Sequence, residues 1–250
     1  MELNILYYKK LGKELYLHKI KDGFNYITEW SYKRMTETDN NFYSKGNYIN
    51  YPALINIQSP INLVYEFKRQ NGIGGYFTNR YSYSEAKLHL QGKGFLGIKE
   101  ISNDDLTLGF KTQAIKSHSW SYQVIPYQTN TYKTSNSYLI NTSTLNNEFI
   151  NLGINKCWFR VNSITENKFF EGQNFSTSFI YDSYGNQTKI TKNINNIETQ
   201  VTEVTYGQYG TPIPAKPTLI TQTSTRSGES SYSQQTKIEY NTLGQVYKKN

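Results

Sequence analysis

The residues with the clearest chemical potential are the glycines of a G-x-G-x-x-G string, Gly92, Gly94 and Gly97. In a dinucleotide site such glycines let the backbone approach a pyrophosphate, and a helix must begin at the third glycine within a strand–helix–strand unit. The residues after the string do not favour a helix, because Ile98–Ile101 is β-like and the segment 103–105 favours a turn. We therefore expect no cofactor here and interpret the string as a glycine-rich bend where strands approach closely.

The other groups that could do catalytic or metal chemistry are isolated in the sequence. His18, His89 and His118 have no His, Cys or carboxylate at ligand spacing, and Cys157 is the only cysteine. The adjacent acids Asp104–Asp105 would point to opposite faces of a strand, so they could not easily share a proton. No G-x-S-x-G, H-E-x-x-H or calcium-loop pattern is present. We expect no catalytic residue, no metal site and no enzyme.

The charge of the chain is basic but diffuse. Its formal net charge is +8 and its pI is about 9.2. Lysines and arginines are scattered apart from short pairs, whereas nucleic-acid binding requires clustered cations. Charges interrupt any signal-peptide core near the start, and no stretch approaches the roughly 18 to 20 apolar residues of a bilayer span. We expect no nucleic-acid partner, no membrane span and no signal peptide in this sequence.

Strands are the elements that composition and periodicity predict. The chain has 23 Tyr, 12 Phe and 3 Trp, and aromatic and β-branched side chains suit pleated surfaces. Polar and apolar residues alternate with period two over 26–32 and 175–181, among other segments. Only 84–90 and 143–152 show a helical period, for about two turns each. The expected fold class is all-β, built from consecutive antiparallel β-hairpins.

Turn signals divide the chain and suggest its organisation. Lys21–Gly23 and Asn71–Gly75 carry residues typical of hairpin turns. The stretch Gly207–Pro217 holds three of the six prolines, which remove ladder donors and predict a break between hairpins. The pattern is irregular over 1–169 and repetitive over 170–250, so we place a soft domain boundary near residue 170.

A repeated hairpin lies in the C-terminal third. FIYDSYGNQTKI, Phe179–Ile190, aligns with KIEYNTLGQVYK, Lys237–Lys248. In each copy a Tyr ends one strand, an Asp or Asn caps the turn, a Gly takes the left-handed position, and the return strand follows. The turn residues of the two copies are Tyr181, Asp182, Gly185 and Asn186 in the first, and Tyr240, Asn241 and Gly244 in the second.

These residues resemble the YD-repeat, or Rhs, family, which is named after its Tyr-Asp pair. Further upstream, SPINLVYEFKRQNGIGG (Ser59–Gly75) and RYSYSEAKLHLQGKGFLGIKEI (Arg80–Ile101) resemble the segment before the YD repeats in relatives of the B component of bacterial insecticidal toxin complexes. The resembling blocks cover about 15–110 and 170–250.

The resemblance implies a twisted sheet or solenoid strip that forms part of a hollow shell around a toxin polypeptide. The partners it implies are other segments of the same shell and the enclosed polypeptide, in a larger bacterial protein that is secreted or displayed at the cell surface. The family's self-cleaving C-terminal segment has no counterpart in this sequence and is not carried over. The alternative is an exported carbohydrate- or cell-surface-binding β module, in which Trp30, Trp120 and Trp158 would help bind a glycan.

Overall fold

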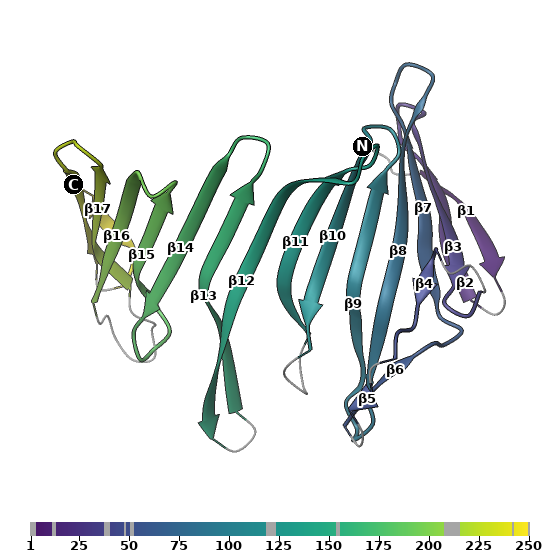
Figure 1. Cartoon of the computed structure of the whole chain (residues 1–250), viewed down its shortest axis with the longest axis horizontal. Coiled ribbons are helices and arrows are strands. Elements are labelled where there is room, and N and C mark those ends of the chain that lie inside the picture. The colour runs from purple at the N-terminus through teal and green to yellow at the C-terminus, as the bar shows by residue number, and fades with distance from the viewer. Residues whose placement is uncertain are drawn as a thin grey trace. The chain divides into compact units, whose positions relative to one another are not determined.

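The computed structural model describes residues 4–11, 14–37, 41–47, 49–50, 53–118, 124–153, 156–207, 216–241 and 243–249. In this part of the chain every regular element is a β-strand, which confirms the all-β prediction (Figure 1). None of the described residues forms a helix with the length and apolar character needed to cross a bilayer. The chain divides into two compact units, Met1–Ile140 and Asn141–Asn250.

The first unit is an antiparallel sheet with one excursion. Its strands are β1 (Asn4–Leu11), β2 (Glu14–Lys21), β3 (Ile27–Arg34), β4 (Tyr43–Ser44), β5 (Ile49–Asn50), β6 (Leu54–Ile57), β7 (Asn62–Gln70), β8 (Tyr76–His89), β9 (Gly94–Asp105), β10 (Phe110–Ser117) and β11 (Ile125–Lys133). Pairing runs β1–β2–β3–β7–β8–β9–β10–β11, always antiparallel. Because β3 pairs with β7, the chain between them leaves the ladder and returns.

That excursion supplies the buried core. It carries β4, which runs parallel to β8, and β6, which pairs with β8 antiparallel (Figure 1). Met35 and Phe42 from the excursion are 0% and 1% exposed, and they cluster with Tyr43, Ala86 and Ile98. Burying large side chains of this kind stabilises a fold by roughly 1.5 to 3 kcal/mol each. Residues that precede β8 in the chain are therefore hydrogen-bonded along it, and the buried cluster joins them to Ile98 of β9.

The second unit is a meander of neighbouring strands. Its strands are β12 (Tyr138–Gly153), β13 (Lys156–Lys168), β14 (Gln173–Tyr181), β15 (Gln187–Ile194), β16 (Glu198–Gly207), β17 (Lys216–Arg226), β18 (Tyr232–Tyr240) and β19 (Val246–Lys249). Each pairs antiparallel with the next. Along β14 half-buried and exposed residues alternate strictly, as the period-two pattern predicts. No apolar side chain is fully buried among the described residues of this unit.

The two segments with a short helical period are strands, and the turn predicted at 103–105 is wrong. Residues 84–89 lie in β8 and residues 143–152 lie in β12, where ladder pairing overrides a weak helical period. The segment 103–105 ends β9 and pairs with both β8 and β10, and the turn follows at 106–109. Asp105 caps that turn, because its carboxylate accepts hydrogen bonds from the backbone N–H groups of Thr107 and Leu108.

Two further predictions concern the break between hairpins at Gly207–Pro217 and the domain boundary near residue 170. β16 ends at Gly207 and β17 begins at Lys216, while 208–215, most of the proline-rich stretch, lie outside the described residues. The boundary near residue 170 was placed where the sequence begins to repeat, and it falls at the turn between β13 and β14 inside the second compact unit. It stays a prediction about the repeat.

Candidate functional site

The same five-residue turn is built four times in the described chain, at Asp22–Tyr26, Asn71–Gly75, Asp182–Asn186 and Asn241–Gln245. We call it the Asx turn. In each copy the side-chain oxygen of the first residue accepts hydrogen bonds from the backbone N–H groups of the third and fifth residues, at 2.8 to 3.1 Å. The N–H of the first residue donates to the carbonyl of the fifth at 2.9 to 3.0 Å. One Asp or Asn therefore organises the whole turn.

The fourth position of every Asx turn has a positive φ. It is 67° at Asn25, 89° at Gly74, 92° at Gly185 and 73° at Gly244. Glycine adopts this conformation freely and Asn tolerates it better than other residues. Gly185 and Gly244, the glycines of the two repeat copies, occupy this fourth position, and the copy at Asp22 uses Asn in place of glycine.

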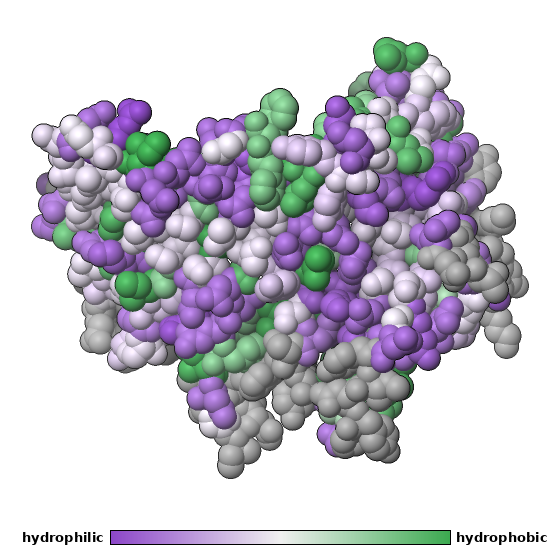
Figure 2. Space-filling model, in the orientation of Figure 1, coloured by the Kyte–Doolittle hydropathy of each residue, from purple (hydrophilic) through white to green (hydrophobic). Residues whose placement is uncertain are grey.

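The third position of every Asx turn holds a large apolar side chain in solvent. Phe24 is 76% exposed, Ile73 is 89%, Tyr184 is 80% and Leu243 is 77%. The tip of the β7–β8 hairpin, which carries the Asn71–Gly75 turn, stands out as hydrophobic in Figure 2. The apolar tips are thus a property of the repeated turn.

A second repeated device, which we call the tyrosine clasp, fastens neighbouring strands where their ladders stop. A Tyr hydroxyl on the later strand donates to a backbone carbonyl on the earlier one. The described residues form five clasps: Tyr32 to Leu17 (2.8 Å), Tyr83 to Val64 (2.8 Å), Tyr181 to Val161 (2.7 Å), Tyr206 to Gln187 (3.0 Å) and Tyr240 to Pro217 (2.8 Å). They join β2–β3, β7–β8, β13–β14, β15–β16 and β17–β18.

All five clasps share one register. On the later strand, the Tyr lies three residues after the residue of the last ladder pair. On the earlier strand, the accepting carbonyl lies two residues before the other member of that pair. For example, Ser163↔Ser178 is the last pair beside the clasp of Tyr181 with Val161. The hydroxyl therefore replaces a ladder hydrogen bond where the strands begin to separate. Burial raises the pKa of the Tyr83 phenol to about 12.

The clasp at Tyr181 is also packed by aromatic and cationic groups. The Trp158 ring meets the Tyr181 ring edge-on at 6.1 Å, and the Arg160 guanidinium lies 5.0 Å from the Tyr181 centroid. A Cβ on Gly185 would lie 2.5 Å from Trp158. The second copy has a similar cation, since the Lys216 ammonium lies 5.4 Å from the Tyr240 centroid and donates to the Gly244 carbonyl.

Hydrogen bonds hold the Asp182 carboxylate in its ionised form. Slight burial raises its pKa, but the Asn186 amide side chain and the backbone N–H groups of the turn outweigh that effect and lower the pKa below its ordinary value. Asn186 contributes both a side-chain and a backbone donor to Asp182, each at 2.9 Å. These contacts bring Asp182, Gly185 and Asn186 into one turn, which directly follows Tyr181 at the end of β14.

The glycine string of the sequence forms a β-hairpin bend. Gly92, Gly94 and Gly97 all have positive φ, at 97°, 70° and 112°. The first lies in the turn between β8 and β9, and the strand residues that follow Gly97 stand where a dinucleotide site would need a helix. Gly97 pairs with Lys87 of β8 beside an irregularity in the register.

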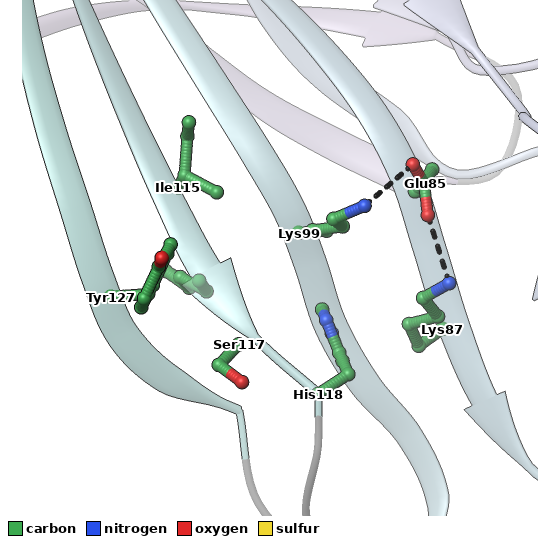
Figure 3. Close-up of a pocket in the computed structure, with 8 residues that line it drawn as sticks. Glu85, Lys87, Lys99, Ile115, Ser117, His118 and Tyr127 are labelled. Carbon is green, nitrogen blue, oxygen red and sulfur yellow. Dashed lines mark hydrogen bonds and ion pairs between the residues drawn. The ribbon is translucent and has the colours of Figure 1, made fainter. Parts of the chain in front are cut away.

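A basic pocket opens in the first unit where two strands separate (Figure 3). Pairing of β9 with β10 stops at Glu100↔Ile115, whereas β10 and β11 stay paired as far as Ser117↔Ile125. The pocket is open to solvent on one side, has a volume of roughly 360 Å³, and is lined by Glu85, Lys87, Lys99, Ile115, Lys116, Ser117, His118 and Tyr127. Four neighbouring strands, β8 to β11, and the residue just after β10 therefore contribute to one pocket.

One carboxylate holds two ammonium groups in this pocket. Glu85 accepts from Lys87 at 3.0 Å and from Lys99 at 2.9 Å. Burial raises the pKa of the Glu85 carboxyl, but the hydrogen bonds from the two lysines outweigh it, and the pKa lies below its usual value. Burial lowers the pKa of Lys87, whose side chain is 2% exposed.

The other groups noted in the sequence lie apart from one another. His18 Nδ1 is 2.6 Å from the Trp30 carbonyl, and His89 accepts from the Gln91 N–H. The described residues contain no group of three or more His, Cys, Asp or Glu side chains arranged to hold a metal. The Cys157 side chain and all of Trp120 lie outside what the structure describes. The sequence alone could not predict that His118 lies near Lys87 and Lys99, because their proximity depends on the order of the strands in the sheet.

No protein-family model matches the sequence, and no curated protein matches it at a significant level. Solved structures do match its fold. A chain of the crystal structure of TcdB2-TccC3-Cdc42 aligns with 91% of this chain at a TM-score of 0.64 and 7% identity, and a chain of TcdB2-TccC3 gives the same values. The aligned part is 17% of the length of each of those chains. The chain therefore shares its all-β fold, at a distance, with components of a toxin complex.

Proposed function

We propose that the chain is a non-enzymatic segment of a YD-repeat (Rhs-type) shell that encloses a toxin or effector polypeptide, within a larger exported protein. The observation that carries this proposal is the fold shared over 91% of the chain with much longer toxin complex components. The Tyr-Asp and Tyr-Asn turns at Tyr181 and Tyr240, which prompted the family resemblance, lie at the hairpin ends of this fold.

The packing of the second unit supports a role within an assembly. Half-buried and exposed residues alternate along β14, yet no apolar side chain is fully buried among the described residues of this unit. A sheet stabilises itself by burying one face against another layer. In the proposed shell, adjoining segments or the enclosed polypeptide supply that layer.

The Asx-turn tips support the same role. Four large apolar side chains occupy the same turn position and stand 76% to 89% exposed. Single exposed apolar residues need no explanation, but a repeated placement at hairpin ends suits contacts with neighbouring segments. Trp30 and Trp158 contact Phe67 and Tyr181 in cross-strand pairs, which favours a structural use of these rings over a glycan platform.

The test uses the product of the complete reading frame in which this sequence occurs. Electron microscopy should show a closed β shell, and an enclosed polypeptide should resist trypsin until the shell is opened by denaturant. A matched sample of the same polypeptide produced alone should be digested at once. Equal digestion of both samples, or particles without a closed shell, would rule out encapsulation.

A further inference from the structure

The pocket between β9 and β10 has an excess of positive charge. Lys87, Lys99 and Lys116 line it, and Glu85 is the one acidic side chain among its lining residues. Glu85 is already shared by two of the lysines at 3.0 and 2.9 Å. Charges in a partly enclosed site act through a lower effective dielectric than in water, so this excess attracts an anion more strongly than scattered surface lysines do.

The backbone at the pocket is strained. Glu85 has a φ of 54°, in the left-handed region that residues other than glycine rarely adopt. Such conformations cost on the order of 1 to 3 kcal/mol, and they concentrate at binding sites. Here the strain accompanies the placement of one carboxylate between Lys87 and Lys99 (Figure 3).

His118 faces the same pocket with its polar atoms unsatisfied. Both ring nitrogens are buried and have no hydrogen-bond partner among the described residues. Burial and the charges of Lys87 and Lys99 lower the pKa of this imidazole to about 4, so at neutral pH it is uncharged and carries one N–H donor. A buried donor without an acceptor costs roughly 1 to 3 kcal/mol, which a bound acceptor recovers.

We infer that this pocket binds a small organic anion, with its oxyanion head at Lys99, Lys116 and His118 and its apolar body against Ile115 and Tyr127. The head would accept hydrogen bonds from ammonium and imidazole groups, and the two apolar side chains would cover a ring or short aliphatic group. The site belongs to the first unit alone. It goes beyond the proposed shell role, and neither depends on the other.

The test measures binding of benzoate and phenyl phosphate to the full chain by isothermal titration calorimetry. Acetate and inorganic phosphate provide the head without the body, and benzyl alcohol provides a body without charge. One aromatic anion should bind saturably at one site per chain and more tightly than its headgroup alone, while benzyl alcohol should not bind. Comparison of benzoate and acetate with phenyl phosphate and inorganic phosphate identifies which headgroup, carboxylate or phosphate, the pocket prefers.

Variants distinguish binding in the pocket from non-specific attraction of anions to a basic protein. Lys99→Gln and Lys116→Gln should each weaken binding by about tenfold, because each removes a charge-assisted hydrogen bond. Lys189→Gln is a matched control, since Lys189 and Lys99 are equally exposed at 39% and each pairs with one glutamate. Absence of saturable binding, or equal weakening by Lys189→Gln, would overturn the inference. Each variant's thermal unfolding, compared with wild type, confirms that it is folded.

Discussion

Replacing Tyr181 by Phe tests whether the clasp stabilises the hairpin array. The substitution keeps the ring, which contacts Trp158 and Arg160, and removes the hydroxyl that donates to the Val161 carbonyl at 2.7 Å. A hydrogen bond of this kind contributes about 1 kcal/mol net, within a range of roughly 0.5 to 1.5 kcal/mol. For a cooperative unit of about 110 residues this loss corresponds to a melting temperature lower by roughly 4 °C.

The assay combines denaturant unfolding with amide hydrogen exchange. The Tyr181→Phe variant should unfold at lower denaturant concentration, and protection should fall locally around the last ladder pair, Ser163↔Ser178. Tyr184→Phe is the control. Tyr184 is 80% exposed, so removing its hydroxyl should change the free energy of unfolding by less than about 0.5 kcal/mol. Equal stability of both variants, with unchanged exchange in β13 and β14, would refute the clasp as a stabilising contact.

Three further predictions address the turn and the pocket. In denaturant unfolding, Gly185→Ala should lower the free energy of unfolding more than Gly74→Ala. Both substitutions place a Cβ at a positive φ, but only the Cβ at position 185 would meet a neighbour, Trp158 at 2.5 Å. Equal losses of stability would show that the contact with Trp158 adds no cost. Asp182→Ala should cost about 1 to 2 kcal/mol, while Asp182→Asn should be nearly neutral in the same assay, as Asn performs this role in two other Asx turns. The pKa of His118 is about 4 in the folded chain, against an ordinary value of 6.5, so the unfolded chain takes up a proton at higher pH. The free energy of unfolding should therefore decrease as the pH falls from 6.5 towards 4. The His118→Gln variant should lack this part of the pH dependence.

The fold class could be predicted from the sequence because its signals are local. Period-two alternation over 175–181 specifies a half-buried strand, and the structure shows that alternation residue by residue. Residues 84–90 and 143–152 were ambiguous, because a short window can satisfy both the helical and the strand period. Their ladders with distant strands decided the outcome, which a local pattern does not contain.

The candidate site was less accessible to sequence reasoning. Lys21–Gly23 and Asn71–Gly75 were recognised as turn signals, but their identity with the Tyr-Asp turn was missed, because no Tyr precedes Asp22 or Asn71. The first turn also uses Asn25 where the others use glycine. A search for Asp or Asn followed three residues later by Gly or Asn would have found all four. No sequence spacing could have assembled the basic pocket, since its residues meet only through the order and divergence of β8 to β11.

The geometry also explains why the Tyr-Asp pair marks the hairpin array in the sequence. At Tyr181–Asp182 the Tyr fastens β14 to the strand before it, while the Asp closes the turn to the strand after it, so two adjacent residues couple successive hairpins. At Tyr83 the clasp occurs within β8, well before any turn, so no Asp follows and the sequence signature is lost although the contact is the same. The clasp and the Asx turn are therefore separable contacts. A sequence search detects them only where they coincide, whereas substitutions at Tyr83 and Tyr181 should reveal the same loss of one hydrogen bond.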